Sequence, residues 1–139
     1  MMTQRITATW QSNMAFSSDI DGHTVVTDAP ESIGGTNSGP SPKKLMMTSL
    51  AGCSGIDVAM ILGKMRVEVD DFSIEVSGEL SDGEPSVYTR MHLRYVFAGK
   101  NLPFEKLQRA VQLSQEKYCG VSIMYARIMD ISWEIVVKE

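Results

Sequence analysis

The segment from Ser41 to Arg66 is the feature that most constrains this fold, because it predicts one long helix that is apolar on two sides. Ser41 suits the position that caps a helix, and Pro42 suits its first turn. Apolar residues then recur at helical spacing in two stripes: Met46, Leu50, Cys53, Ile56 and Met60, and Met47, Ala51, Val58, Leu62 and Met65. Such a helix is expected to be buried between layers of the fold, or between a sheet and a second subunit.

Segments of alternating apolar and polar residues flank this helix and predict strands. Three expected strands precede it, at residues 6–10, 14–20 and 23–27, and three follow it, at residues 72–80, 87–97 and 129–137. A second helix is expected from about Asn101 to Cys119, followed by a short turn at residues 121–127. This order predicts an α+β fold with antiparallel sheets, segregated helices and a single domain over residues 1–139.

Two regions between these elements carry expectations of their own. The loop from Asp28 to Pro40 contains several glycines, and loops of this length are often functional. In a hairpin centred near Gly83, the acidic side chains of residues 75 and 79 lie among Arg90, His92 and Arg94, which predicts a solvated sheet face. We therefore expect His92 to be a surface residue without a catalytic role.

Composition excludes several classes of function. A net charge of -4 argues against a general nucleic-acid surface. The first residues lack the apolar region of a secretion signal, and the uncharged stretch from Leu45 to Ile56 is expected to be too short to span a bilayer. We therefore expect a cytoplasmic protein with no nucleic-acid or membrane partner. Cytosolic cysteines are usually reduced, so a permanent structural disulfide is not expected.

The chemistry of the chain rests on its two cysteines. No glycine-rich phosphate motif follows a strand, and neither the histidines nor the cysteines have the spacing of a metal site. Cys53 and Cys119 are either two buried fillers or one redox couple. The helix carries only small residues beside Cys53, namely Gly52, Ser54 and Gly55. Such a surface lets a small substrate approach the sulfur, which favours a reactive thiol. Backbone N–H groups at the helix boundary next to Cys119 are expected to lower the pKa of its thiol.

Two blocks of sequence make the chain resemble the OsmC/Ohr family of thiol peroxidases, named for osmotic induction and organic hydroperoxide resistance. The first block runs from Gly39-Pro40-Ser41-Pro42 through Leu50-Ala51-Gly52-Cys53, and the second is Lys117-Tyr118-Cys119-Gly120-Val121-Ser122. The resemblance covers nearly the whole chain. It implies an intertwined homodimer with its active sites at the subunit interface.

The resemblance also implies a mechanism. Cys53 is the peroxidatic thiol that attacks an organic hydroperoxide or hydrogen peroxide, and Cys119 resolves the resulting sulfenic acid as a disulfide. An external dithiol then reduces the disulfide, and no bound cofactor is needed.

The chain departs from the family pattern at the residues that assist the thiol. Family members carry an acid in the first turn of this helix, paired with an arginine from the N-terminal strands. Here Lys43 and Lys44 occupy the first turn, and no arginine lies between Arg5 and Arg66. We therefore interpret the chain as a divergent branch and hypothesise that Lys43 or Lys44 supplies the positive charge near Cys53. The alternative for these lysines is ordinary solvated charge.

Three functions follow from this reading. The first is a thiol-dependent peroxidase that uses Cys53 and Cys119. The second is a non-enzymatic or sensory dimer that keeps the fold and binds a small apolar or anionic ligand between its subunits. The third is a soluble protein whose cysteines only fill the core. Disulfide trapping after stoichiometric peroxide separates the first function from the other two.

Overall fold

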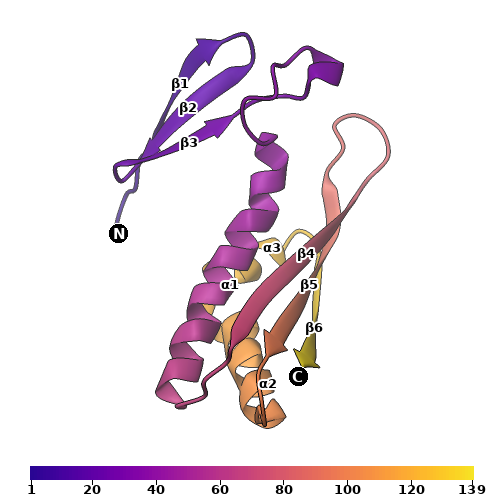
Figure 1. Ribbon diagram of the computed structural model, residues 1–139. Helices are drawn as coiled ribbons and strands as arrows, with labels where there is room; N and C mark the ends of the chain where they lie inside the picture. Colours follow the sequence, from indigo (N-terminus) through magenta and orange to yellow (C-terminus); the bar gives the residue numbers. More distant parts are fainter. The chain divides into compact units, whose positions relative to one another are not determined.

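The computed structural model describes residues 1–139 as two compact units, Met1–Met46 and Met47–Glu139 (Figure 1). The boundary between them falls in the first turn of the long helix α1 (Leu45–Lys64). The two cysteines, Cys53 and Cys119, therefore both belong to the second unit.

The first unit is built on an antiparallel sheet with the order β1-β2-β3. Its strands are β1 (Thr7–Ser12), β2 (Ala15–Ile20) and β3 (His23–Thr27). The predicted hairpin at Asp21-Gly22 is confirmed, and both residues have positive φ angles, of 51° and 83°. This is the backbone shape that favours Gly and Asp in tight two-residue turns.

The buried carboxylate of Asp28 organises the loop that follows β3. Asp28 Oδ2 accepts hydrogen bonds from the Ser38 hydroxyl (2.6 Å), the Thr36 hydroxyl (2.8 Å) and the Ser38 N–H (3.0 Å), and Oδ1 accepts one from the Ala29 N–H (2.7 Å). The bonds from Ser38, then those from Ala29 and Thr36, hold the pKa of Asp28 well below its usual range. Gly35 packs against the Ala29 carbonyl so closely that a Cβ would collide with it.

The second unit contains a sheet with the order β4-β5-β6. Its strands are β4 (Asp71–Leu80), β5 (Tyr88–Ala98) and β6 (Asp130–Lys138). Between β5 and β6 the chain forms α2 (Phe104–Leu113), the π-helical turn η3 (Ser114–Tyr118) and α3 (Gly120–Tyr125). The expectation of antiparallel sheets holds for β4 with β5, but β6 runs parallel to β5. The reason is the helical crossover, which returns the chain to the end of the sheet where β5 began.

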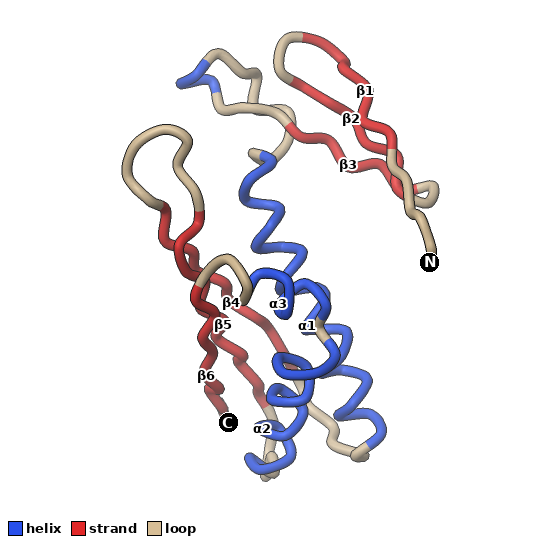
Figure 2. Tube along the Cα trace, turned by 180° about the vertical axis from the view of Figure 1, so that it is seen from behind, coloured by secondary structure: helices blue, strands red, loops and turns tan.

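All the helices of the second unit cover one face of its sheet (Figures 1 and 2). The core between these layers contains Leu50, Val58 and Leu62 from α1, Met91, Leu93, Tyr95 and Phe97 from β5, and Leu107, Ala110 and Val111 from α2. The opposite face carries Glu75 paired with Arg94 (2.8 Å), Glu79 with Arg90 (3.0 Å) and His92 with Glu134 (2.6 Å). The predicted solvated face of the hairpin is thus confirmed.

The helix α1 buries one row of side chains and leaves another row uncovered. The buried row is Leu50, Ser54, Val58 and Leu62, spaced four residues apart. Ile56 and Met60, which we placed on an apolar stripe, are 65% and 55% exposed. The layers of a single chain therefore cover the second predicted stripe at Val58 and Leu62 but only part of the first, in which Leu50 is buried.

The membrane expectation needs a correction. The helical segment Pro42–Lys64 is long and apolar enough to cross a bilayer by length and composition. The uncharged stretch from Leu45 to Ile56 therefore does not exclude a membrane span by length, because the helical segment continues beyond it at both ends. One such helix is weak evidence, since core helices of soluble proteins meet the same criterion. Here the helix packs Leu50, Val58 and Leu62 into the core of its own unit.

The hydrogen bonds of Asp28 predict a pH-dependent contribution to stability. Because folding lowers the pKa of this carboxyl from its ordinary 3.8, the contribution is complete above that value and is lost as the pH falls below it. We expect Asp28→Asn to lower the urea midpoint at pH 7 and the difference from wild type to shrink below about pH 4. Circular dichroism would measure this, with the exposed Asp19→Asn as the control. A difference that stays constant down to acidic pH would contradict the assignment.

Candidate functional site

Cys53 lies near the middle of α1, next to the buried row of that helix. Its side chain is a free, partly exposed thiol, whereas the adjacent Ser54 is fully buried. A Cβ on Gly52 would meet nothing within 4 Å, and one on Gly55 would only touch the Ile74 side chain at 3.4 Å. The small neighbours therefore leave the helix surface beside the sulfur open, as the sequence predicted.

Cys119 lies at the junction between η3 and α3. Its N–H donates to the Ser114 carbonyl at 2.7 Å, and its Sγ accepts a hydrogen bond from the Ser122 N–H at 3.3 Å. The residue caps α3 in an extended conformation, with φ of -79° and ψ of 98°. The predicted helix end at Cys119 is therefore confirmed, and the thiol is held from two sides in a fully buried position.

The fold brings the two thiols together from the long helix α1 and the junction between η3 and α3. The Cys53 side chain is among the groups that raise the pKa of Cys119, so the two thiols are neighbours, and both cysteines are free. Burial is the largest of the effects that raise the pKa of Cys119 to about 12, and the neighbouring Cys53 and Asp57 act in the same direction. The Ser122 N–H lowers the Cys119 pKa, as the sequence predicted, but loss of solvation is the larger effect, so the expected net direction was wrong.

Buried hydroxyls connect the two cysteine-bearing segments. The Ser54 hydroxyl lies 2.6 Å from the Tyr95 hydroxyl and 2.8 Å from the Ser114 hydroxyl. Ser114 in turn donates to Asp57 Oδ2 at 3.0 Å. Because Ser54 follows Cys53 and Ser114 bonds the backbone of Cys119, these contacts join α1, β5 and η3 beside the thiols.

Gln115 extends this network toward α3. Its Nε2 donates to the Tyr95 hydroxyl at 2.6 Å, and its Oε1 accepts a short hydrogen bond from the Ser122 hydroxyl. Ser122 also supplies the N–H that bonds Cys119 Sγ. No buried side-chain nitrogen or oxygen lacks a partner, so the network is completely satisfied.

The sequence analysis does not identify these polar partners, although the sequence marks one of them, Asp57, as an unusual charge. Asp57 is the one charged residue between Lys44 and Lys64, and it follows Cys53 by four residues, one helical turn. A lone acid at that spacing in an apolar helix could have been recognised. Tyr95 and Gln115 carried no comparable signal, because their positions next to Ser54 depend on how the helices pack on the sheet.

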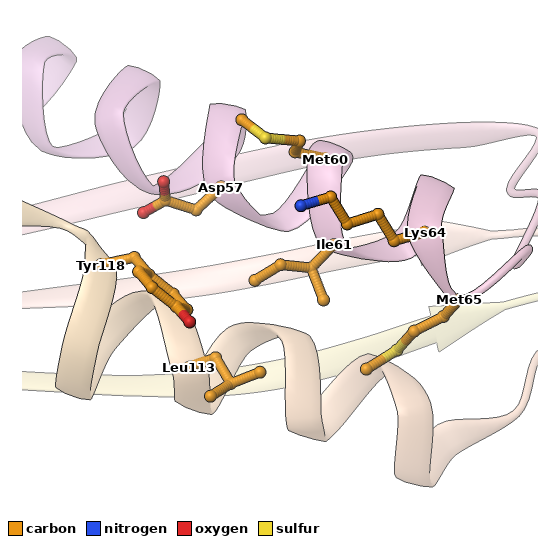
Figure 3. Close-up of a pocket in the computed structure, with 7 residues that line it drawn as sticks. All are labelled: Asp57, Met60, Ile61, Lys64, Met65, Leu113 and Tyr118. Atoms are coloured by element: carbon orange, nitrogen blue, oxygen red, sulfur yellow. The ribbon is translucent and has the colours of Figure 1, made fainter.

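An apolar cavity of about 490 Å³ begins at Asp57 and runs between α1 and the α2–η3 segment (Figure 3). It is lined by Asp57, Met60, Ile61, Lys64, Met65, Leu113 and Tyr118. Asp57 and Tyr118 lie at one end, and Lys64 and Met65 lie toward the other (Figure 3). Most of the wall is therefore apolar, with the polar groups of Asp57 and Tyr118 at one end and the Lys64 side chain toward the other.

Lys43 and Lys44 are exposed residues of the short 3-10 helix η2 (Pro42–Lys44) in the first unit. Both cysteines lie in the second unit. The charge support that we expect from these lysines stays a prediction.

Comparison with known proteins places this two-thiol, α+β chain in a class. The family described as OsmC-like protein matches residues 35–134. Protein YhfA of Escherichia coli strain K12 is 33% identical over 133 residues, which cover 91% of this chain and 94% of YhfA. The chain belongs to the OsmC-like family, as its two sequence blocks indicated.

Solved structures agree with this assignment. The crystal structure of a hypothetical protein from Aquifex aeolicus VF5 is 32% identical, matches with a TM-score of 0.84 and covers both chains completely. The organic hydroperoxide resistance protein OhrB of Bacillus subtilis shares the fold, with a TM-score of 0.67 at 22% identity over 96% of this chain and 98% of OhrB. The predicted fold class, with its long central helix, is thus confirmed, and these matches support a soluble protein.

The unequal environments of the two thiols predict selective labelling. At pH 8 we expect iodoacetamide to modify Cys53 in the folded protein and to leave Cys119 unmodified, because Cys119 is buried and its pKa is about 12. Mass spectrometry of the digested protein would locate the label, with a urea-unfolded sample as the control. Equal labelling of both cysteines in the folded protein would contradict the described environment.

Proposed function

We propose that this protein is a thiol-dependent peroxidase in which Cys53 reacts with the peroxide and Cys119 resolves the product. The observation that carries the proposal is the contact between a partly exposed thiol and a fully buried one. Two cysteines that only filled a core would have no need to meet, since they lie 66 residues apart (119 minus 53).

The proposed reaction has three steps. The Cys53 thiolate attacks the outer oxygen of the peroxide, the O–O bond breaks, and an alcohol or water leaves with a proton from solvent. The resulting Cys53 sulfenic acid condenses with the Cys119 thiol, which forms the disulfide and releases water. An external dithiol then donates two electrons and two protons to regenerate both thiols. No bound cofactor takes part.

The difference between the thiols supports this division of roles. A high pKa keeps Cys119 protonated, and its burial keeps peroxide away, so Cys53 is the thiol that a peroxide meets. Cys119 is already in contact with Cys53, which makes the second step intramolecular.

The cavity beside the thiols supports an organic hydroperoxide as the substrate class. Its largely apolar wall suits the organic part of such a molecule, and its polar end begins one helical turn from Cys53. The Bacillus subtilis protein that shares the fold is an organic hydroperoxide resistance protein, which supports the same substrate class. Hydrogen peroxide remains the second proposed substrate.

The proposal includes a homodimer, because α1 leaves apolar residues uncovered. The location that we propose is the cytoplasm. Ile56 and Met60 are exposed, and a shallow groove beside them is lined largely by small and apolar residues of α1 and β4. A second copy would remove this surface from water.

Sedimentation would test the dimer directly. We expect a single species of twice the chain mass at low micromolar concentration, because the uncovered side of α1 favours association. The variant Ile56→Glu should shift the species toward monomer, and Thr89→Glu on the exposed part of β5 serves as the control. A wild-type protein that sediments only as a monomer would contradict the dimer.

Two serine variants test the thiol couple. Cys53→Ser should abolish peroxide consumption, because a serine hydroxyl is a far weaker nucleophile toward peroxide. Cys119→Ser should allow one oxidation of Cys53 and then stall or overoxidise under excess peroxide. A coupled peroxidase assay and mass spectrometry of an intrachain Cys53–Cys119 disulfide would measure both effects. Unchanged turnover in Cys53→Ser would rule out the peroxidatic role.

A further inference from the structure

We propose that Asp57 is a positioning residue of the thiol couple: its carboxylate orients a chain of buried hydroxyls that holds the segment bearing Cys119 against the helix bearing Cys53. This inference rests on the proposed redox pairing of the two cysteines. It concerns the geometry of disulfide formation and not the attack on peroxide.

The carboxylate of Asp57 fixes the direction of the hydrogen bonds in this network. A carboxylate can only accept, so Ser114 must donate its single hydroxyl proton to Asp57. The Ser114 oxygen is then free to accept from the Ser54 hydroxyl, 2.8 Å away. Asp57 therefore sets the direction of the first two bonds in the chain.

The same rule fixes the direction of the remaining bonds. Ser54 uses its proton toward Ser114, so it accepts from the Tyr95 hydroxyl at 2.6 Å. Tyr95 in turn accepts from Gln115 Nε2 at 2.6 Å. Every hydroxyl thus donates once toward Asp57, and bonds aligned in one direction strengthen one another.

Both ends of this chain act on Cys119. Ser114 supplies the carbonyl that accepts the Cys119 N–H at 2.7 Å. At the other end, Gln115 Oε1 accepts from the Ser122 hydroxyl, and the Ser122 N–H donates to Cys119 Sγ at 3.3 Å. The position of Cys119 over Cys53 therefore depends on a network that ends at one carboxylate of α1.

The hydroxyl groups of this network are buried, so water cannot replace a hydrogen-bond partner that is lost. Ser54, Ser114 and Tyr95 are each fully buried. A buried hydroxyl without a partner is strongly destabilising, so removal of the final acceptor leaves Ser114 free to turn and the chain free to reverse. The ionisable groups that face Cys119 are Cys53 and Asp57 from α1, Tyr95 from β5 and Tyr125 from α3.

The test measures how well the two thiols are placed for each other. The equilibrium constant of the Cys53–Cys119 disulfide in a dithiothreitol redox buffer reports this placement without any peroxide. We expect Asp57→Ala to lower the constant by about tenfold, the loss of roughly one hydrogen bond to a charged group. The isosteric Asp57→Asn, which can still accept from Ser114 but can also donate, should give a smaller decrease. Asp82→Asn, in the exposed β4–β5 turn, is the matched control and should leave the constant unchanged.

A second readout separates positioning from general destabilisation. The alkylation rate of Cys53 in the reduced protein should stay at the wild-type value in Asp57→Asn, whereas a loosened fold would raise it. In the peroxide assay, the rate of Cys53 oxidation should be unchanged while disulfide formation slows. If Asp57→Ala does not fold, Asp57→Asn carries both measurements.

The outcomes distinguish this inference from the proposed function. A disulfide constant that is equal in wild type and both Asp57 variants would overturn the positioning role, even in an active peroxidase. A constant that falls as expected in a protein that consumes no peroxide would support the positioning role and refute the peroxidase. A wild-type protein that forms no intrachain disulfide would overturn both.

Discussion

The burial of Cys119 beneath Cys53 is the constraint on which the rest of the site depends. A thiol removed from water becomes a poorer acid, and here loss of solvation outweighs the backbone N–H that favours the thiolate. The two sulfurs are therefore chemically unequal although they touch. That inequality separates the partly exposed thiol of Cys53 from the fully buried thiol of Cys119.

The same burial explains why a helix–sheet core contains so many hydroxyl groups. Cys119 reaches Cys53 only if the η3–α3 junction is fixed against α1, and apolar packing alone leaves such a junction free to shift by small amounts. Directional hydrogen bonds from Ser54, Ser114 and Tyr95 restrict it further. The cost of burying these groups is offset because each has a partner, and the fold gains a defined position for one sulfur.

The sequence predicted the elements of this fold better than their arrangement. Alternation and helical spacing are local properties, so the strands, the long helix and the helix end at Cys119 follow from them. The parallel pairing of β6 with β5 does not, because it depends on the path of the crossover. The two cysteines were identifiable as candidates, whereas the direction of the Cys119 pKa was not, since burial beneath α1 is a property of packing. Asp57 stood out in the sequence only as a lone charge.

The charges around the couple bear on how this branch of the family activates its thiol. Among the groups that shift the pKa of Cys119, Asp57 carries a negative charge and none is a cation. Asp57 carries no positive charge and its carboxylate accepts from the Ser114 hydroxyl, so it cannot take the place of the arginine that assists the thiol in the family. The hypothesis that Lys43 or Lys44, from the same chain or from a partner subunit, supplies a positive charge near Cys53 stays a prediction. In the proposed mechanism, the second unit itself supplies the resolving half of the chemistry: a buried thiol and the hydrogen bonds that hold it.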